Sequence, residues 1–310
     1  MTPFRPASLR TYPLSARPSK VGLAEFGRPV APGATVAGFL RSLPDILQAR
    51  DFRLFVEALR RAKAGEKAVI WALGAHVIKT GLNPVIIDLM KRGWVTGLAL
   101  NGAGIIHDFE IAAAGRTSED VAAQIRLGRF GMARETGEML NEAIRRGADR
   151  RTGLGQAVGE MIARSALPHK KHSLLAAAWR LGLPATVHVA LGTDVIHLHP
   201  RASGAAIGQT SLQDFFLLAA LVRDLDGGGV FLNVGSAVVL PEVFLKAVAL
   251  VRNQGFRLDG FDTAVFDFFR HYRPAENVAR RPLGKKGRGF YFIGPHEILI
   301  PLLAAALKGR

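Results

Sequence analysis

Short apolar runs alternate with longer segments of helical periodicity along most of the chain. Six runs have the length and the aliphatic content of buried strands: 68–73 (AVIWAL), 96–100, 185–190, 230–234, 262–266 and 290–293. Helical spacing is found in residues 84–92, 105–114, 211–222 and 241–252. This alternation predicts an α/β fold, with a Rossmann-like, mainly parallel sheet and helices on both faces.

Two further segments complete the predicted organisation. Residues 118–181 are mostly helical, and we expect them to be inserted between the two halves of the sheet. Residues 1–34 form a basic N-terminal arm ahead of a single domain over 35–310. The arm holds five basic residues, Arg5, Arg10, Arg17, Lys20 and Arg28, against one acidic residue, Glu25. Because the arm lacks the apolar run of a secretory signal, we expect it to pack on the body or on a neighbouring subunit, with a transit peptide as the alternative.

Composition narrows the function classes. The 310 residues are 49% hydrophobic, which supplies a sizeable core and argues against extensive disorder. The chain has no cysteine, so disulfides, thiolate metal sites and cysteine nucleophiles are excluded, and we expect a cytoplasmic protein. The longest apolar window, 230–251, is interrupted by Asn233, Ser236, Glu242 and Lys246, so we expect no membrane partner.

The formal net charge of +16 raises the question of a nucleic-acid partner. The arginines, however, are spread along the whole chain, and no aromatic residues are interleaved with them in a recognition pattern. Examples are Arg145, Arg146, Arg150 and Arg151. We therefore expect a function other than nucleic-acid binding.

Four glycine-containing turns follow predicted strands. They are 74–81 (GAHVIKTG), 101–104 (NGAG), 192–194 (GTD) and 235–236 (GS). In a doubly wound sheet, ligands bind outside the carboxyl ends of the strands, where helix N-termini favour anions. Each turn alone is also what any strand-to-helix connection needs, and NGAG matches neither GxGxxG nor the P-loop pattern.

Two other groups of residues have alternative interpretations. His197 and His199, on an expected strand, would face the same side and suit a metal, with His107 and Asp108 as further ligands. Histidines at strand ends that bond to backbone are the simpler interpretation. The loop 276–289 (ENVARRPLGKKGRG) is either a solvated basic loop or a lid over an anionic ligand.

Several of these segments together resemble the deoxyhypusine synthase family over about residues 68–308. VIKTG resembles the family's Ser-Ser-Gly turn, GAGIIHD its Thr-Ala-Gly-Gly-Val-Glu-Glu stretch, and GTDVIHLH its Leu-Gly-Asp-Met-Ile-Phe-Phe-His stretch. GSAVV resembles Gly-Gly-Gly-Val-Val, RPAENV resembles Arg-Pro-Asp-Glu-Ala-Val, and IPLLAAAL resembles the closing helix. The resemblance implies a homotetramer with NAD held between loops and partner subunits. It also implies oxidation of spermidine by NAD and transfer of its aminobutyl group, through a lysine imine, to an amine of a protein or a polyamine.

The resemblance also implies roles for particular residues. The positions that contact the dinucleotide match Thr80, Gly81, Ala103, Gly104, Asp108, Gly235, Ser236 and Thr263. Asp108 stands where the family has a glutamate for the ribose hydroxyls. Asp194 and Glu276 match carboxylates that bind the cationic amines of spermidine.

This sequence departs from the family at the catalytic lysine. Counting without gaps from Glu276 puts Pro282 at that position, and proline has no amine with which to form an imine. Three explanations are open. Another lysine takes over the role, transfer proceeds without a covalent lysine, or the fold serves another substrate. The lysines considered are Lys79, Lys285 and Lys286.

A second departure concerns the charge of the expected site. Arg280 stands at the position of an active-site tryptophan, and with Arg281 it would repel a polyamine and favour an anion. The leading hypothesis is a deoxyhypusine-synthase-like transferase that binds NAD and an amine. The alternative is a diverged nucleotide-binding protein of the same fold that acts on a different, anionic substrate, and metal-dependent hydrolysis is a third reading.

Overall fold

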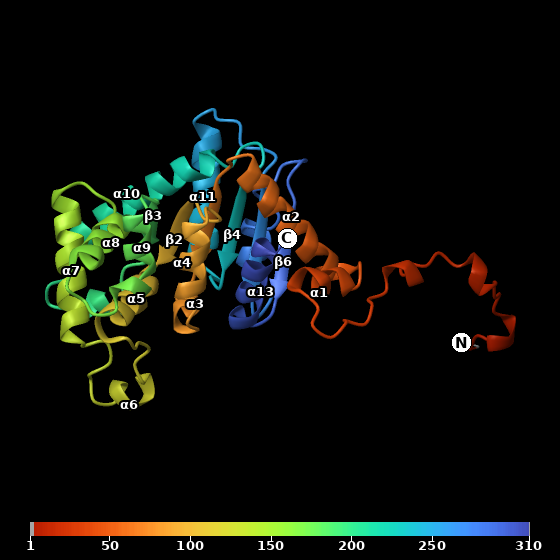
Figure 1. The fold of residues 1–310 in the computed structure, drawn as a ribbon, viewed down its shortest axis with the longest axis horizontal. Helices are drawn as coiled ribbons and strands as arrows, with labels where there is room; N and C mark the ends of the chain where they lie inside the picture. Colours follow the sequence, from red (N-terminus) through yellow and green to blue (C-terminus); the bar gives the residue numbers. More distant parts are fainter. Residues whose placement is uncertain (1–2, 310) are drawn as a thin grey trace.

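A single sheet of six parallel strands forms the centre of the protein, in a computed structural model that describes residues 3–309 (Figure 1). The strands are β1 (Val69–Leu73), β2 (Gly97–Asn101), β3 (Ala185–His188), β4 (Val230–Val234), β5 (Asp262–Asp267) and β6 (Gly289–Ile293). Their spatial order is β3-β2-β1-β4-β5-β6, the order of doubly wound dinucleotide-binding sheets. The predicted α/β class is therefore confirmed.

The strands form because aliphatic residues are buried on both faces of the sheet. Val69, Trp71 and Leu73 of β1 join one hydrophobic cluster, whereas Ile70 and Ala72 join the cluster on the opposite face. All five residues are fully buried. A strand buried on both faces reads as a continuous apolar run, which is why VIWAL is recognisable in the sequence.

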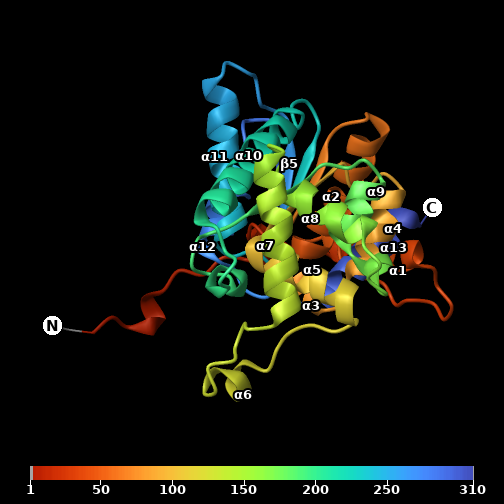
Figure 2. The same ribbon diagram turned by 90° about the vertical axis from the view of Figure 1, so that its left-hand side faces the viewer.

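Two layers of helices cover the sheet, as Figure 2 shows. On one face lie α10 (Gly204–Arg223) and α11 (Val239–Asn253). The opposite cluster takes in α2 (Leu47–Ala64), α3 (His76–Lys79), α4 (Asn83–Lys91), α5 (Gly102–Ala114) and α13 (His296–Lys308). The remaining helices are α1 (Val36–Ser42), α6 (Val121–Ile125), α7 (Arg134–Asp149), α8 (Leu154–Arg164), α9 (Leu174–Arg180) and α12 (Tyr272–Asn277). Short 3-10 turns are η1 (Pro6–Ser8), η2 (Leu14–Ala16), η3 (Leu23–Glu25), η4 (Lys170–His172) and η5 (Val195–Leu198).

The helical middle section lies between β2 and β3 in the chain. It comprises α6 to α9, and α7 and α8 pack against α10 at one end of the sheet. Its hydrophobic residues, such as Leu140 and Val158, belong to the main core cluster. The section is thus an extension of one core rather than a separately packed body.

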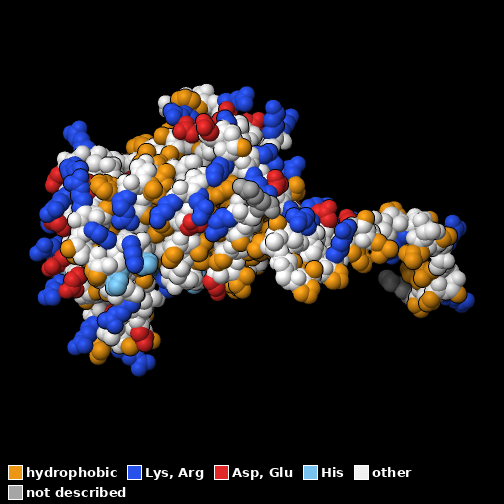
Figure 3. Space-filling model, viewed as in Figure 1, with side chains coloured by type: hydrophobic (Ala, Val, Ile, Leu, Met, Phe, Trp, Pro, Cys, Tyr) orange, Lys and Arg blue, Asp and Glu red, His pale blue; other side chains and the backbone are white. Residues whose placement is uncertain are grey.

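The N-terminal arm projects away from the body (Figure 1). Its first backbone hydrogen bonds to the body are made by Glu25, which accepts from Asp45 (2.9 Å), and by Arg28, which donates to Ser42 (2.8 Å). Residues ahead of Glu25 are exposed, including Phe4, Leu9 and further apolar side chains that Figure 3 shows along the arm. The expected packing of this part of the arm on its own body is therefore not seen in residues 3–24.

Two side chains of α10 close the sheet at its β3 edge. Asp214 Oδ2 accepts a hydrogen bond from the Val187 amide (2.7 Å). Ser211 Oγ donates to the Val187 carbonyl (3.0 Å) and accepts from the Val189 amide (3.2 Å). Backbone groups that an edge strand leaves open are thus satisfied from the helix.

Within residues 3–309, α10 is the one helix that is long and apolar enough to cross a membrane by length and composition. The expectation that no segment meets this test was wrong, because it considered residues 230–251 and overlooked 204–223. In the structure α10 packs against β3 and α11 as part of the α/β layers.

Candidate functional site

The turns after β1 and β4 meet at the point where the strand order reverses, which we call the switch point. β1 and β4 are neighbours in the sheet. After β1 the chain continues to β2 on one side of this pair, and after β4 it continues to β5 on the other side. Gly74 donates to the Val234 carbonyl (2.8 Å), and a Cβ at Gly74 would collide with the Gly235 carbonyl oxygen. Gly235 has a φ of +66°. Glycine is needed at both positions, and the switch point is where ligands bind in this type of sheet.

Three aromatic rings lie around the switch point. Phe268, which follows β5, packs with its centroid 5.0 Å from that of His76 and 4.5 Å from that of His296. His76 opens α3, and His296 opens α13 after β6. The cluster thus brings together residues that are far apart in the sequence, at the carboxyl ends of β1, β5 and β6.

His296 is fully buried and holds one unpartnered lone pair. Its Nε2 donates to the Phe266 carbonyl (3.1 Å), since a carbonyl can only accept. Burial lowers the pKa of His296, so the ring is neutral near pH 7 and Nδ1 is an acceptor. Nδ1 has no hydrogen-bond partner within residues 3–309.

Two more buried acceptors at this edge lack a partner in the described part of the chain. Asp267, the last residue of β5, is 5% exposed; its Oδ1 accepts from the Phe268 amide (2.8 Å), but its Oδ2 is unpartnered. Asn233 donates through Nδ2 to the Ser236 carbonyl (2.9 Å), and its Oδ1 is unpartnered. Buried acceptors are normally satisfied, so these atoms mark a place where a donor is expected.

The turn after β5 is held in position by Tyr291. The Tyr291 hydroxyl accepts from the His271 amide (2.9 Å) and donates to the Phe269 carbonyl (2.8 Å). Burial raises the pKa of Tyr291, which keeps the phenol protonated and able to donate. The guanidinium of Arg270 lies 5.1 Å from the centroid of the same ring. Asp267 is therefore followed by a turn with a defined shape.

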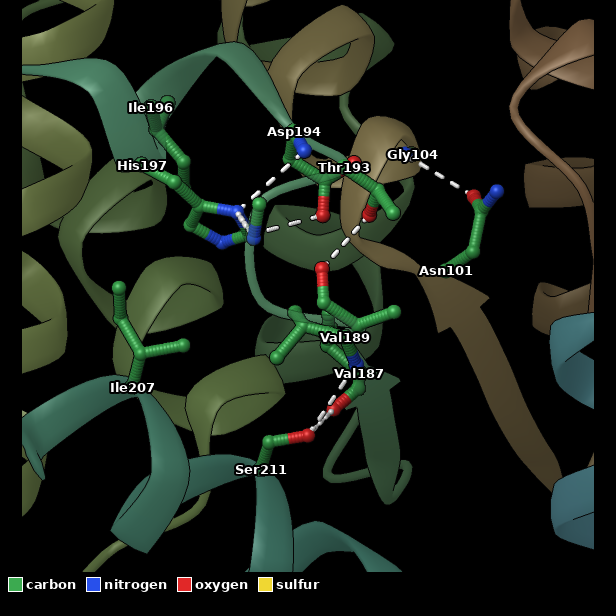
Figure 4. Close-up of polar contacts among 12 residues, drawn as sticks. Asn101, Gly104, Val187, Val189, Thr193, Asp194, Ile196, His197, Ile207 and Ser211 are labelled. Atoms are coloured by element: carbon green, nitrogen blue, oxygen red, sulfur yellow. Dashed lines mark hydrogen bonds and ion pairs between the residues drawn. The ribbon is translucent and has the colours of Figure 1, made fainter. Parts of the chain in front are cut away.

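Most of the predicted dinucleotide contacts lie at this carboxyl edge. Thr80, Gly81, Ala103, Gly104, Gly235 and Ser236 all follow β1, β2 or β4. The Gly104 amide donates to Asn101 Oδ1 (3.1 Å), so that Asn101 caps α5 (Figure 4). Ser236 Oγ accepts from the Leu240 amide (3.3 Å) at the start of α11. That these residues contact a dinucleotide stays a prediction.

Asp108 does not have the exposed position that a ribose ligand needs. It is fully buried on α5, and its carboxylate accepts from Ser173 Oγ (2.6 Å) and from the amides of Leu174 (2.7 Å) and Leu175 (3.1 Å). Asn83 Nδ2 donates to the same carboxylate (3.1 Å). Burial raises the pKa of Asp108 to about 6, against the effect of these bonds. Its role here is to hold the start of α9 against α4 and α5.

Three other predicted residues lie at the wrong edge of the sheet. Thr263 is the second residue of β5, is fully buried, and donates to the Val278 carbonyl (2.9 Å). Lys285 and Lys286 precede β6, next to Gly260, which precedes β5. Both lysines are therefore at the amino edge, a strand length of roughly 16 Å from the switch point. They are removed as candidates for the catalytic amine.

The loop from Glu276 to Pro282 is held by ion pairs and by a hydrogen bond from a side chain of α11. The Glu276 carboxylate accepts from Arg280 (Nε, 2.7 Å) and lies 3.5 Å from Arg281. These ion pairs lower the pKa of Glu276. The Pro282 carbonyl accepts from Arg252 at the end of α11 (2.7 Å). Glu276 is thus engaged with Arg280 and Arg281.

Asp194 lies over the start of α5, where a Cβ at Gly102 would collide with its carboxylate. His197 Nδ1 accepts from the amides of Gly192 (3.1 Å) and Asp194 (3.3 Å), so Nε2 carries the proton (Figure 4). His197 Nε2 is 3.9 Å from Asp194 Oδ2, and neither atom has a hydrogen-bond partner in the described chain. Burial raises the pKa of Asp194. Asp194 is 8% exposed, so a substrate amine would reach it only at its edge.

Lys79, on α3, is the remaining candidate lysine at the carboxyl edge. Its charge acts on His107 of α5, whose pKa is lowered to about 4 by burial first and by Lys79 second. Thr117 donates to Glu110, so the Thr117 hydroxyl accepts from His107 Nδ1 (2.7 Å). His107 is therefore neutral, and its lone pair is on Nε2.

The alternative interpretation of His197 and His199 as metal ligands is not supported by the described residues. No group of three or more His, Cys, Asp or Glu residues suited to a metal is found in residues 3–309. The segment that holds His197 is the 3-10 turn η5 rather than a strand, so His197 and His199 do not alternate as strand residues would. His188 Nε2 bonds to Thr186 Oγ1 (3.0 Å).

Two hollows beside α7 are the most voluminous of the described surface hollows, but they are lined by paired charges. A hollow of 540 Å³ lies between α7 and α8, and one of 590 Å³ lies between α7 and α10. Arg146 pairs with Glu142 (2.8 Å), and Arg150 pairs with Glu160 (2.9 Å). We place the site at the switch point instead, because buried polar atoms without partners are found there.

Sequence reasoning missed four residues of this site. They are Asn233, Asp267, Phe268 and His296. Asp267 and His296 had a recognisable signal, because each is a polar residue directly after or just beyond a buried strand. The aromatic contact of Phe268 with His76 had none, since it depends on how the turns after β5 and β1 meet.

Comparison with known proteins gives a fold and no family. No protein-family model matches the sequence, and no curated protein matches it. Among solved structures, a candidate deoxyhypusine synthase from Entamoeba histolytica has a TM-score of 0.53 at 10% identity, over 90% of this chain and 95% of that one. A conserved candidate LOR/SDH protein from Methanococcus maripaludis S2 has a TM-score of 0.51 at 12% identity, over 90% and 71%.

AgrE, in a ternary complex with ornithine and NAD+, has a TM-score of 0.52 at 15% identity, over 84% of this chain. The match covers 34% of the AgrE chain, so this chain spans about a third of that protein's length. At these identities the likeness shows the fold alone. The chain therefore has a deoxyhypusine-synthase-like α/β fold, which it shares with about a third of AgrE.

Proposed function

We propose that the protein is an NAD-dependent enzyme that acts on an aliphatic amine. More specifically, we propose that it transfers an aminobutyl group, as deoxyhypusine synthases do. The observation that carries the proposal is the group of unpartnered buried acceptors at the ends of β4, β5 and β6: Asn233 Oδ1, Asp267 Oδ2 and His296 Nδ1. Leaving such atoms without a donor costs free energy, so they favour a ligand rich in N–H and O–H groups. Ribose hydroxyls and ammonium groups have this chemistry.

The residues at the switch point fit a dinucleotide. Gly74 and Gly235 keep side chains away from the edge, which lets a pyrophosphate approach the backbone of the turns after β1 and β4. Phe268 and His76 offer rings against which a heteroaromatic base can stack. NAD, when bound, would supply the acceptor for a hydride. AgrE, a third of which matches this fold, forms a complex with ornithine and NAD+, and this supports the proposal.

Carboxylates at this edge suit a cationic amine. Asp267 has one free oxygen and is 5% exposed, which concentrates its negative charge in a region of low dielectric constant. We assign Asp267 to bind the substrate ammonium, with Asp194 as a second carboxylate toward β3. Glu276 is left out because Arg280 and Arg281 already neutralise it.

Lys79 is the residue we assign as the amine nucleophile in the transferase form. An amine reacts only when it is unprotonated. His107, with a pKa of about 4, is too weak a base to hold that proton, so the proton of Lys79 would pass to solvent; the hydrogen bonds through Thr117 to Glu110 fix the orientation of the neutral His107 ring. The anionic-substrate alternative loses part of its support, since Arg280 and Arg281 both pair with Glu276.

Calorimetric titration with NAD+ and absorbance assays for NADH, with spermidine and separately with ornithine as substrates, test the proposal. We expect saturable NAD+ binding and NADH formation with an amine. Asp267→Asn, which keeps the acceptor for the Phe268 amide, should lower turnover at least tenfold. Asp149→Asn, on the exposed end of α7, is the matched control.

The outcomes separate the parts of the proposal. Absence of NAD+ binding would refute it altogether. Binding of NAD+ without NADH formation from either amine would leave a dinucleotide-binding protein and remove the amine chemistry. Borohydride trapping of a substrate adduct on the peptide that contains Lys79, absent in Lys79→Gln, would establish the covalent route.

A further inference from the structure

The outward face of α10 is almost free of polar side chains. The exposed residues of this 20-residue helix are Gly204, Ala205, Gly208, Gln209, Leu212, Phe216, Leu217, Ala220 and Arg223. Leu212 is 55% exposed and Phe216 is 54% exposed. Large exposed apolar patches on soluble proteins mark interaction sites. We call these nine residues the α10 face.

The α10 face carries a ridge whose two halves are complementary in size. Gly204, Gly208, Leu212 and Phe216 are spaced four residues apart, which makes them one i±4 ridge of the helix. A two-fold axis through the middle of this ridge sets Gly208 against Leu212 of a second copy, and Gly204 against its Phe216. Small residues then meet large ones at every step, as a self-complementary isologous contact requires.

Gly208 is an independent indication that another backbone approaches this helix. It lies inside α10, where glycine is the weakest helix former after proline. A Cβ built at Gly208 would meet no atom within 4 Å, and its φ is not positive. The fold of a single copy therefore gives no reason for glycine at this position. Close approach of a neighbouring helix is a reason.

The charge distribution favours a second copy over a charged partner. The chain has a formal net charge of +16, so two copies repel each other over most of their surfaces. On the α10 face the one charged residue is Arg223, at the end of the helix. Contact through this face therefore brings the two positive surfaces together where repulsion is smallest.

A groove next to the ridge extends the apolar surface to α11. It has a volume of 340 Å³ and is lined by Phe216, Ala220, Leu250 and Phe256, among others. Phe256 is 50% exposed, and the guanidinium of Arg223 lies 5.6 Å from the centroid of its ring. A helix of this length is about 30 Å long and 10 Å wide, so the α10 face supplies roughly 300 Å² per copy before the groove is added, which is the size of a weak, reversible contact.

We propose that the α10 face is a two-fold interface between two copies of this chain, in which Gly204 and Gly208 of each copy receive Phe216 and Leu212 of the other. The modest area predicts a dimer that dissociates at micromolar concentration. This interface is separate from the switch point, so the proposal does not depend on the proposed enzymatic function.

Sedimentation velocity of the full chain over a range of concentrations tests the proposal. The wild type should form dimers as its concentration rises, and Phe216→Glu should remain a monomer. Gly208→Leu should also remain a monomer, although a single copy has room for the new side chain. Ile125→Glu, a change of equal charge at an exposed position of α6, should dimerise like the wild type.

An exchange of residues gives the sharpest test. The double variant Gly208→Leu with Leu212→Gly has the composition of the wild type, and it restores a small residue opposite a large one across the two-fold axis. We expect it to dimerise, whereas Gly208→Leu alone does not. Circular dichroism spectra matching the wild type confirm that each variant is folded.

Three results would overturn the proposal. One is a wild type that stays monomeric up to the highest soluble concentration, and another is a Phe216→Glu variant that dimerises like the wild type. The third is a monomeric wild type that co-sediments with phosphatidylcholine vesicles while Phe216→Glu does not, which would assign the α10 face to a membrane surface.

Discussion

Asp214 provides the most direct quantitative test of how burial shapes this protein. It lies on α10, is fully buried, and its Oδ2 accepts from the amides of Gly155 (2.8 Å) and Val187 (2.7 Å). Its Oδ1 has no hydrogen-bond partner in residues 3–309. Burial raises the pKa of Asp214 to about 7, against the lowering effect of the backbone bonds. The change we consider is Asp214→Asn, which keeps the acceptor and removes the charge.

The magnitude follows from proton linkage. The pKa of Asp214 is about 7 in the folded state, against about 3.9 when unfolded, and this difference corresponds to about 4 kcal/mol. Because the folded pKa is raised, this stabilisation is fully present below about pH 4, declines as the pH rises, and is lost above pH 7. Asparagine has no such dependence, but its buried NH2 group without an acceptor costs about 1–3 kcal/mol.

Urea unfolding followed by far-UV circular dichroism, from pH 4 to pH 8, measures the difference between the two proteins. We expect the wild type to be more stable at pH 4 and Asp214→Asn to be more stable at pH 8, with the two curves crossing between. Asp108, whose pKa is also raised, is present in both proteins and cancels in the difference. A difference in unfolding free energy that did not change with pH would refute the assigned burial effect.

Three further predictions concern the edges of the sheet. Gly74→Ala should lower the unfolding free energy by about 1–3 kcal/mol in urea titrations, because the new Cβ collides with the Gly235 carbonyl, and an unchanged midpoint would contradict this close approach. Asp108→Ala should lower the unfolding free energy by about 3 kcal/mol or more in the same titrations, because four buried donors lose their acceptor. If the variant instead kept its stability and lost affinity for NAD+, Asp108 would again be a candidate ligand of the dinucleotide. Lys79→Gln should raise the pKa of His107 in an NMR titration, but the value should stay below 6.5 because burial is the larger cause. An unchanged pKa would show that the charge of Lys79 does not act on His107.

The sheet and its helices could be predicted from the sequence, because strands that are buried on both faces appear as short, nearly continuous apolar runs. β1 is a continuous apolar run, β4 is apolar except for Asn233, and glycine follows each of them; both were predicted with bounds within one residue of the structure. The positions of Lys285 and Lys286 could also have been inferred. They directly precede a predicted strand, and in a parallel sheet residues that precede a strand lie at the amino edge.

Other parts of the site could not be inferred from the residues alone. Asp108 follows a glycine turn. The sequence does not distinguish a carboxylate that binds a ribose at this position from one that accepts hydrogen bonds from the start of another helix. The partners that decide its role, Ser173 and Leu174, lie in a distant segment. The same holds for Phe268 and His76, whose contact depends on the packing of two turns.

The position of β1 in the middle of the sheet has a consequence for how the chain folds during synthesis. β1 pairs with β4 in a register that joins Val69 to Val230. At ordinary translation rates of 5–20 residues per second, roughly 10 to 30 s pass between the synthesis of these two residues. During that interval one side of β1 lacks its neighbouring strand, and contacts between such distant residues also form slowly. The nascent chain is thus at its most vulnerable to misassociation before β4 emerges, and chaperone capture of ribosome-bound fragments that end ahead of residue 230 would be strongest.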